Sequence, residues 1–386
     1  MTKSFGKIIF VLILILKSNC FGLGQSLKFS GYFADFVIYQ KIKDDFAVRF
    51  GLDKNLFLNF GRIRLRPEFE YEWGGGVYVE YEIDALYNSS NLFFNFAEIG
   101  TRRQILKLRW NLANGSKFST FHFIDRLYFK KDFGNLNLTL GRQRISWGTG
   151  RIWNPTDLFN PINPANFSKI EKDGADVVSV KFYLGSFTDI QFVYNPIDKF
   201  KMNNYGVRFR TNYHEFDFSF MSGLFDKRGV AGFDFAGNLL KAGVRGEMIF
   251  SADVKNFKSN FFKFILGFDN QFTKNIYGLV EYHFNGEGKS KKDEYEIERL
   301  INGEILNLSK NYVFVMLNYA LNPIASFSAS LNKNLNDGSG FVSLGFSYSV
   351  SDNSDLNFGA LIFHGDEGDE YWYYSTSAFV RFQFYF

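Results

Sequence analysis

The segment from Arg62 to Trp73, RIRLRPEFEYEW, alternates strictly between two kinds of residue. Its even positions carry three arginines followed by three glutamates, and its odd positions carry apolar or aromatic residues and one proline. A period of two is typical of a β-strand, because successive side chains of a strand point to opposite faces. The segment therefore predicts a strand with one charged face and one apolar face.

The alternation resumes after a glycine turn at 74–76 and continues from Val77 to Asp84. Two alternating strands joined by a glycine turn predict a β-hairpin. Similar segments recur along the chain, for example at 213–222, 260–271 and 376–386, with large aromatic residues on the apolar face. A soluble β-sandwich can also produce such hairpins, so the pattern alone leaves the direction of the apolar face open.

The aromatic content indicates that the apolar face points outward. The chain contains 50 phenylalanines, and 20% of its residues are aromatic. A soluble two-sheet core must interdigitate large and small side chains, whereas lipid and its interfacial girdles accept many large aromatics. An arginine that faces lipid at the midplane of a barrel costs about 2 to 4 kcal/mol. Arg62, Arg64 and Arg66 are therefore expected to face a wet lumen.

These segments predict an all-β fold, a transmembrane, antiparallel, up-and-down β-barrel of about 18 strands, in a range of roughly 16 to 20. The segment 102–112 could form one further strand. Short turns such as 132–135 and 351–353 alternate with long loops such as 148–175 and 285–309. Bacterial outer-membrane barrels have this asymmetry, with short periplasmic turns and longer outer loops.

The first 24 residues are expected to form a cleaved signal peptide, which leaves 25–386 as the barrel. The run from Ile8 to Leu16 is apolar, follows two lysines and precedes small residues. It is too short to span a bilayer as a helix, which needs about 20 residues. Cys20, the only cysteine, falls in this segment, and lipidation at LKSNC is the alternative interpretation. The expected location is the outer membrane of a Gram-negative cell, in contact with its lipid and lipopolysaccharide.

The charge balance gives no reason to expect nucleic-acid binding. The chain has 44 basic and 40 acidic residues, and three of the lysines lie in the expected signal peptide. The exported part therefore carries a formal charge of +1, which is not the strongly basic balance of a nucleic-acid-binding protein.

The final strand ends on alternating aromatics, Phe382, Phe384 and Phe386. Chain ends are usually polar and frayed, so this end needs an explanation. A terminal aromatic after alternating apolar residues resembles the insertion signal that the barrel-assembly machinery of outer membranes reads. That machinery is therefore an expected partner.

Three segments have a recognisable pattern: DRLYF at Asp125–Phe129, LGRQRISWGTGRIWNPTDLFNPINP at Leu140–Pro164, and GVRGE at Gly243–Glu247. Together they resemble a group of largely uncharacterised porin-like outer-membrane proteins. The architecture is more loosely similar to the alginate-export channels, which are single-chain barrels. Both resemblances imply a channel, and neither names its cargo.

The alternation changes phase at Gly141, where a bulge is expected to turn the following arginines into the lumen. The alternative is that the strand has left the membrane there. The loop from Gly148 to Lys172 holds three of the six prolines, and such a stiff loop is expected to fold into the mouth of the barrel. Its expected constriction residues are Trp153, Asn154, Pro155 and Asp157.

The lumen is expected to separate its charges, with glutamates near the turns and arginines higher up. Such rings can select solutes by charge, although opposite charges can also pair across strands and stiffen the wall. The residues expected to line the lumen and contact solute are Arg62, Arg64, Arg66, Glu68, Glu70, Glu72, Glu80, Glu82, Arg126, Arg142, Arg144, Arg208 and Arg210.

The sequence does not indicate an enzyme. Its four histidines are not accompanied by a nucleophile motif, so no catalytic residue, cofactor or metal site is expected. The acidic stretch 366–370 could hold a cation, but a solvated loop is the preferred interpretation because known calcium-loop spacing is absent. The expected function is a porin-like channel for passive passage of small polar or anionic solutes. The alternative is a loop-closed barrel that binds a ligand or surface polymer without conduction.

Overall fold

The computed structural model describes residues 25–44, 47–48, 53–90, 103–160, 171–197, 202–301 and 303–386. The expected signal peptide, including Cys20, lies outside the described residues, as do Pro161 and Pro164 of the long loop.

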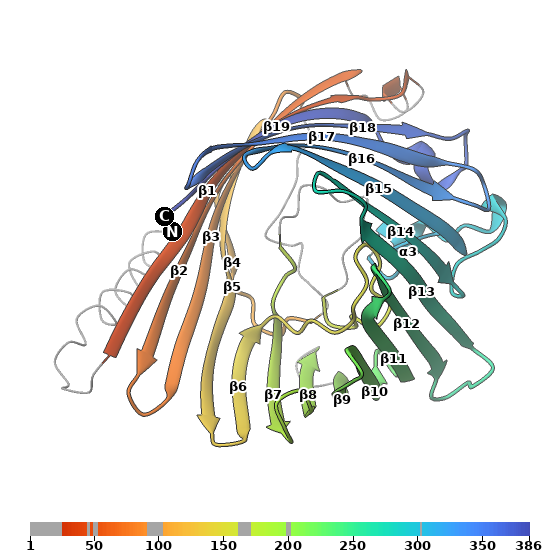
Figure 1. Ribbon diagram of the computed structural model, residues 1–386. Helices are drawn as coiled ribbons and strands as arrows, with labels where there is room; N and C mark the ends of the chain where they lie inside the picture. The colour runs from red at the N-terminus through yellow and green to blue at the C-terminus, as the bar shows by residue number, and fades with distance from the viewer. Residues whose placement is uncertain are drawn as a thin grey trace.

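The described chain forms one antiparallel sheet that closes on itself (Figure 1). Closure follows from β1 (Gln25–Lys41), which pairs with β2 (Asn55–Tyr71) along one edge and with β19 (Thr376–Tyr385) along the other. The remaining strands are β3 (Gly75–Asn88), β4 (Arg109–Asn114), β5 (Phe118–Phe133), β6 (Leu136–Gln143), β7 (Ala175–Tyr183), β8 (Asp189–Ile197), β9 (Met202–Tyr213), β10 (Phe216–Phe225), β11 (Arg228–Leu239), β12 (Ala242–Asp253), β13 (Asn260–Gln271), β14 (Ile276–Asn285), β15 (Asn311–Asn322), β16 (Ala325–Asn334), β17 (Gly340–Ser351) and β18 (Ser354–His364).

The ring has eighteen positions, although the described chain contains nineteen strands. Along one edge, β5 pairs with β3 over nearly its whole length. Along the other edge, residues 119–123 of β5 pair with β4, and residues 127–133 pair with β6. The strands β4 and β6 therefore share one position in the ring. The predicted barrel of about 18 strands is confirmed, and the extra strand suspected near 102–112 is the short β4.

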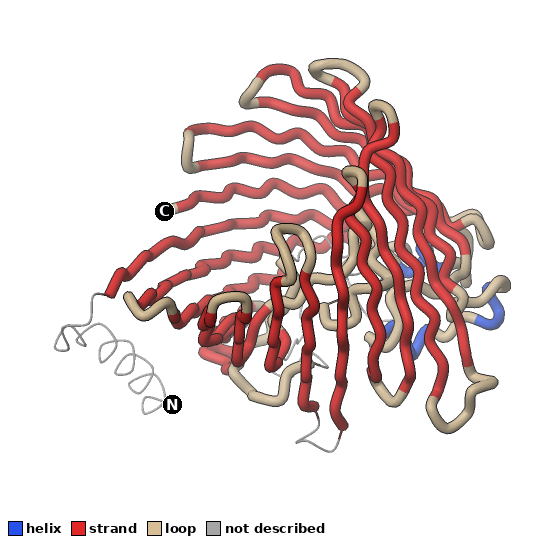
Figure 2. The backbone as a smooth tube through the Cα atoms, turned by 60° about the horizontal axis from the view of Figure 1, so that its bottom comes forward, coloured by secondary structure: helices blue, strands red, loops and turns tan. Residues whose placement is uncertain are grey.

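The connections differ in length at the two ends of the barrel, as predicted. Tight turns join β2 to β3, β5 to β6, β15 to β16 and β17 to β18. Figure 2 shows such short turns between neighbouring strands. The long connections join β3 to β4, β6 to β7 and β14 to β15 at the other end. Short helical segments lie in the long loops of the described chain, among them η4 (Lys292–Glu294), α3 (Ile297–Ile301) and η5 (Glu370–Tyr373).

The two faces of the wall have opposite chemistry. On β2, Arg64 is 2% exposed, whereas its neighbour Ile63 is 41% exposed. The same contrast recurs around the ring, for example between buried Ser219 and exposed Phe220. An apolar outside and a polar inside are the reverse of a soluble β-sandwich, so the predicted outward apolar face is confirmed. Among the described residues, no helix is long and apolar enough to cross a membrane.

The last residue of the chain completes the seam between β1 and β19. The Gly31 backbone N–H donates to the Phe386 carbonyl at 2.9 Å, and the Phe386 N–H donates back at 3.1 Å. The Phe386 ring stacks on Phe29, with ring centroids 6.1 Å apart, and lies over Gly31. Recognition of this end by the assembly machinery stays a prediction.

We expect Gly31→Ala to destabilise the barrel by about 1 to 3 kcal/mol, the usual cost of overpacking. A Cβ at this position would stand 2.4 Å from the Arg64 carbonyl oxygen and 2.7 Å from the Phe386 ring. Urea unfolding in detergent micelles measures the loss. Gly229→Ala is the control, because its Cβ would have the Ala252 carbonyl oxygen, at 3.9 Å, as its nearest neighbour. Equal stability of the two variants would contradict the importance of this close approach.

Candidate functional site

The segment 144–160, which follows β6 and which we call the strap, lies along the inner wall of the barrel (Figure 1). The Trp147 indole Nε1–H donates to Gln191 of β8 at 3.1 Å. Further along, the strap reaches side chains of β12, β14 and β15. It therefore spans a large part of the inner circumference.

Glu247 of β12 is the first anchor of the strap. Its Oε1 accepts the N–H groups of Thr149 and Gly150 at 2.5 Å each, and its Oε2 accepts the N–H and the hydroxyl of Thr156 at 3.1 and 2.7 Å. Gly148 has a φ of +92°, and a Cβ there would stand 2.7 Å from Glu247 Oε1. This glycine lets the backbone approach the carboxylate closely.

Glu281 of β14 is the second anchor, and it is fully buried. It accepts the N–H groups of Arg151, Ile152 and Trp153 at 2.9, 3.2 and 2.8 Å. Successive peptide N–H groups that converge on one anion are a strong arrangement, because hydrogen bonds to a charged acceptor exceed neutral ones. Two lumen carboxylates therefore supply the acceptors that a neighbouring strand would supply elsewhere.

Apolar contacts hold the strap against the wall as well. Trp147 and Phe159 pack edge to face with ring centroids 5.2 Å apart, and they lie among inward-facing Val177, Met221 and Ile249. Trp153 stacks on His283 of β14 at 5.2 Å. The inner wall is thus apolar under the strap, in contrast to the polar lumen elsewhere.

The expected constriction residues all belong to the strap. Trp153 and Asp157 are buried, and Asn154 and Pro155 are half-buried. The Asp157 carboxylate pairs with Lys172 and accepts the Asn160 N–H at 3.1 Å. Burial raises the pKa of Asp157, and Lys172 opposes this effect. Constriction of a solute path by these residues stays a prediction.

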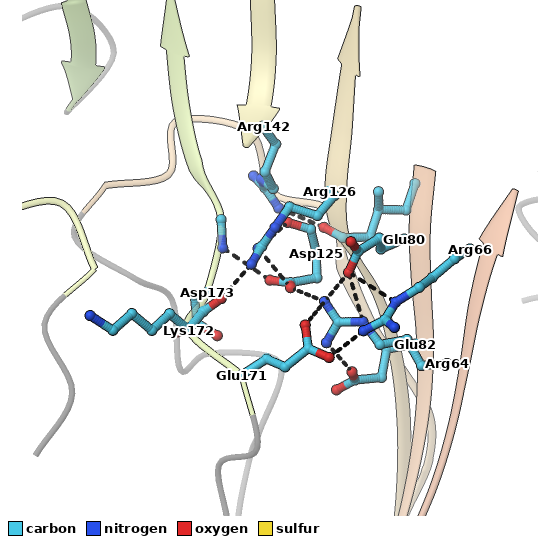
Figure 3. A network of polar contacts seen from close by, with 12 residues as sticks. Arg64, Arg66, Glu80, Glu82, Asp125, Arg126, Arg142, Glu171, Lys172 and Asp173 are labelled. Atoms are coloured by element: carbon cyan, nitrogen blue, oxygen red, sulfur yellow. Dashed lines mark hydrogen bonds and ion pairs between the residues drawn. The ribbon is translucent and has the colours of Figure 1, made fainter. Parts of the chain in front are cut away.

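A second group of charges joins the wall to the segment just before β7 (Figure 3). Arg64 contacts Glu80 at 2.5 Å, Glu82 at 2.8 Å and Asp125. The other contacts are Arg66 with Glu171, Arg126 with Asp125 at 2.7 Å, and Arg126 with the Lys172 carbonyl at 2.5 Å. We call this group the arginine cluster.

The arginine cluster is largely desolvated, and each buried charge has a partner. Arg62 extends the cluster by pairing with Asp84 at 2.9 Å and Glu82 at 3.0 Å. Removing one partner of a buried ion pair is strongly destabilising, because the other charge is left uncompensated. These pairs therefore fix residues 171–173 against β2, β3 and β5. Contact of Arg62, Arg64 or Arg126 with solute stays a prediction.

The other expected solute contacts lie in different surroundings. Arg142 is buried at the seam of β6 and β7, where it binds Asp176 at 2.7 Å and the Leu106 carbonyl at 2.5 Å. Gly141 before it has a φ of +117°, but β6 pairs with both β5 and β7 through this residue without a register shift, so the predicted bulge at Gly141 is wrong. Arg144 is exposed, and Arg210 pairs with Asp189 at 2.8 Å.

The remaining predicted residues divide by height in the barrel. Arg208 is buried with its guanidinium 5.9 Å from the Trp147 ring centroid, beside the strap. Glu68, Glu70 and Glu72 lie toward the turn end of β2, where Glu70 pairs with Lys28 at 2.8 Å. The structure thus separates this set into paired wall residues and more open ones.

Sequence analysis missed the two anchors. Glu247 belongs to the GVRGE segment that carried part of the resemblance, and Glu281 shares a face with His283. In the sequence, neither glutamate can be distinguished from the other polar residues that face the lumen. Their partners are backbone groups 97 (Glu247) or 130 (Glu281) residues away, for which a single sequence contains no signal.

In the acidic outer loop, the Asp369 carboxylate accepts hydrogen bonds from donors of the protein itself. Asp369 binds Lys292 at 3.1 Å and the Asp366 N–H at 2.7 Å. Within the described ranges, no three His, Cys, Asp or Glu side chains converge as a metal site.

Glu370, in η5, is buried and joins three outer segments. It accepts the Tyr312 hydroxyl at 2.5 Å, the Asn334 amide at 3.0 Å and the Leu308 N–H at 3.0 Å. Burial raises the pKa of Glu370 to about 7, because desolvation outweighs the donors that favour the ionised form.

No protein-family model and no curated protein matches the chain. Solved structures do match its fold. OccK5 (OpdH) of Pseudomonas aeruginosa aligns with a TM-score of 0.58 at 9% identity, covering 94% of this chain and 97% of that one. A BenF-like porin of Pseudomonas fluorescens Pf-5 aligns with a TM-score of 0.58 at 8% identity, covering 93% and 98%. The chain has the fold of a porin barrel. The finer resemblances at Leu140–Pro164 and to the alginate-export channels stay predictions.

We expect Glu281→Gln to release the strap, because an amide NH₂ would face N–H donors and leave buried groups unsatisfied. Limited trypsin digestion should then cut after Arg151 about tenfold faster than in the parent protein. Glu247→Gln should act similarly. Glu367→Gln, at an exposed carboxylate of the outer loop, is the control. Unchanged cleavage in both anchor variants would show that the carboxylates do not hold the strap.

Acidification should tighten the packing around Glu370. Because its folded pKa of about 7 exceeds the ordinary value of 4.5, the folded loops bind the proton more tightly. Protonation of Glu370 therefore adds to the free energy of unfolding. This stabilisation is fully present below the ordinary pKa, is lost as the pH rises through the folded pKa, and amounts to about 3 kcal/mol at most. Hydrogen-exchange protection of 365–375 should be higher near pH 5 than near pH 8. Glu370→Gln should abolish the difference, and Glu367→Gln should keep it.

Proposed function

We propose that the protein is an outer-membrane channel for passive passage of small polar or anionic solutes. The observation that carries this proposal is a closed barrel with an apolar outside and a charged inside, across whose inner wall a strap is fixed. Barrels of 16 to 18 strands leave an aqueous channel unless loops fill it.

The distribution of exposed charge supports a role in solute selection. Side chains of Arg66 and Arg210 keep 29% and 43% of their surface exposed, so they can meet a solute while paired. Arg64 and Arg142 are buried in ion pairs and act through the shape of the wall. In this proposal the half-exposed arginines attract anions, and the buried ones fix the segments that flank the strap, Arg142 directly before it and Arg64 through Glu171 after it.

The alternative is a loop-closed barrel that binds a ligand or surface polymer without conducting. The inward strap and the packed outer loops are compatible with it. Conduction separates the two functions, because a closed barrel inserts into a bilayer and carries no current.

Residues 25–386, refolded and inserted into a planar bilayer, should show steady ion-selective openings. Deleting 150–168 should raise the conductance, because it removes most of the strap. Replacing Arg66 and Arg210 with glutamine should shift the reversal potential in a salt gradient toward less anion preference. Lys28→Gln, which removes one positive charge at the turn end, serves as the control for each single replacement. An inserted but silent barrel would refute the channel and favour the binding role.

A further inference from the structure

A cavity of about 530 Å³ lies between the strap and the outer loops. Its floor is formed by strap residues 151–155, and its sides by β12 to β14 and by residues 303–307. This volume is within the range of small-molecule sites, which measure roughly 300 to 1,000 Å³.

Three buried polar atoms without a hydrogen-bond partner in the described chain belong to residues that line this cavity. They are Trp153 Nε1, His283 Nδ1 and Asn285 Oδ1, on side chains 3%, 5% and 3% exposed. Buried polar groups in folded proteins are nearly always hydrogen-bonded, so a cluster of exceptions needs an explanation. The atoms themselves have almost no accessible surface, so a ligand in the cavity reaches them only after a small shift of the lining side chains. An indole donor and an amide acceptor would then match a ligand that both accepts and donates.

The cavity carries more positive than negative charge. Six basic and four acidic side chains line it, which leaves a formal charge of +2. Lys172 is paired with Asp157, and Lys263 with Glu287. Arg228 binds only the Ser251 hydroxyl and the Ser251 and Ser259 carbonyls, and no described carboxylate pairs with it. Asp253 lies opposite Arg228 on β12 and acts on it without a direct ion pair. An arginine without a direct ion pair at the side of a cavity favours an anion.

Aromatic surface completes the lining. Trp153 and His283 form a stacked pair, and Phe261 lies beneath both Arg228 and Lys263, whose charges are 4.6 and 4.9 Å from its ring centroid. A bare inorganic ion would leave this surface and the orphaned polar atoms without contacts. An organic anion with further polar groups would contact the aromatic surface, the arginine and the unpartnered polar atoms.

We infer that this cavity, which we call the strap pocket, binds a small organic anion that carries hydroxyl or amide groups beside its charge. The inference rests on the proposed function in that it names a solute class for the channel. Binding can nevertheless be measured without conduction, so the two can fail separately.

The test is calorimetric titration of the detergent-solubilised full barrel with gluconate, glucose 6-phosphate and neutral glucose. Both anions should bind, and glucose should bind about tenfold more weakly or not at all, as expected for loss of a charged hydrogen bond. Arg228→Gln should weaken gluconate binding about tenfold. Trp153→Phe, which keeps an aromatic ring and removes the N–H, should weaken it severalfold. Lys255→Gln, an exposed lysine outside the cavity, should change nothing.

The possible outcomes separate the pocket from the channel. Conduction without anion binding overturns the strap pocket and leaves the channel intact. Binding without conduction keeps the pocket and favours the receptor role. Equal binding of glucose and gluconate overturns the anionic class. If Arg228→Gln does not refold, Trp153→Phe decides, because unchanged gluconate affinity in that variant contradicts the assigned site.

Discussion

Every peptide group in this protein must find a hydrogen-bond partner, and the architecture depends on how that requirement is met. In lipid no water is available to satisfy an open sheet edge, so only a closed ring of strands is stable there. The pairing of β1 with both β2 and β19 closes the ring, and the final residue completes the last seam through two backbone bonds to Gly31. Alternation of side chains then makes the outside apolar and the inside polar.

The strap solves the same problem by other means. It has no neighbouring strand, yet six of its N–H groups are satisfied because Glu247 and Glu281 project from the wall toward them. Glycines at 148 and 150 remove side chains that would collide with Glu247 or with the strap itself. Packing of Trp147 and Trp153 against apolar wall residues adds the burial that offsets the entropy of ordering a long loop.

The strands could be predicted from the sequence because period two is a local signal, as at 62–73. The position of β4 was harder to predict, because it pairs with only part of β5 and shares its place in the ring with β6. For the site, the alternating pattern correctly placed Arg62 and Arg64 on the inner wall. Their partners could not be predicted, because contacts such as Arg66 with Glu171 join residues 105 apart in sequence. The anchors Glu247 and Glu281 could not be predicted for the same reason, because their backbone partners are also distant in sequence.

The interior strap sets an order of events. Its anchors lie on β12 and β14, which are synthesised long after residue 150, and it lies inside a ring whose seam includes the last residue. A loop outside a sealed cylinder cannot easily enter it through the wall. The six backbone bonds that the strap makes to Glu247 and Glu281 can form only when β12 and β14 stand in place, so the ordered interior depends on the assembled wall.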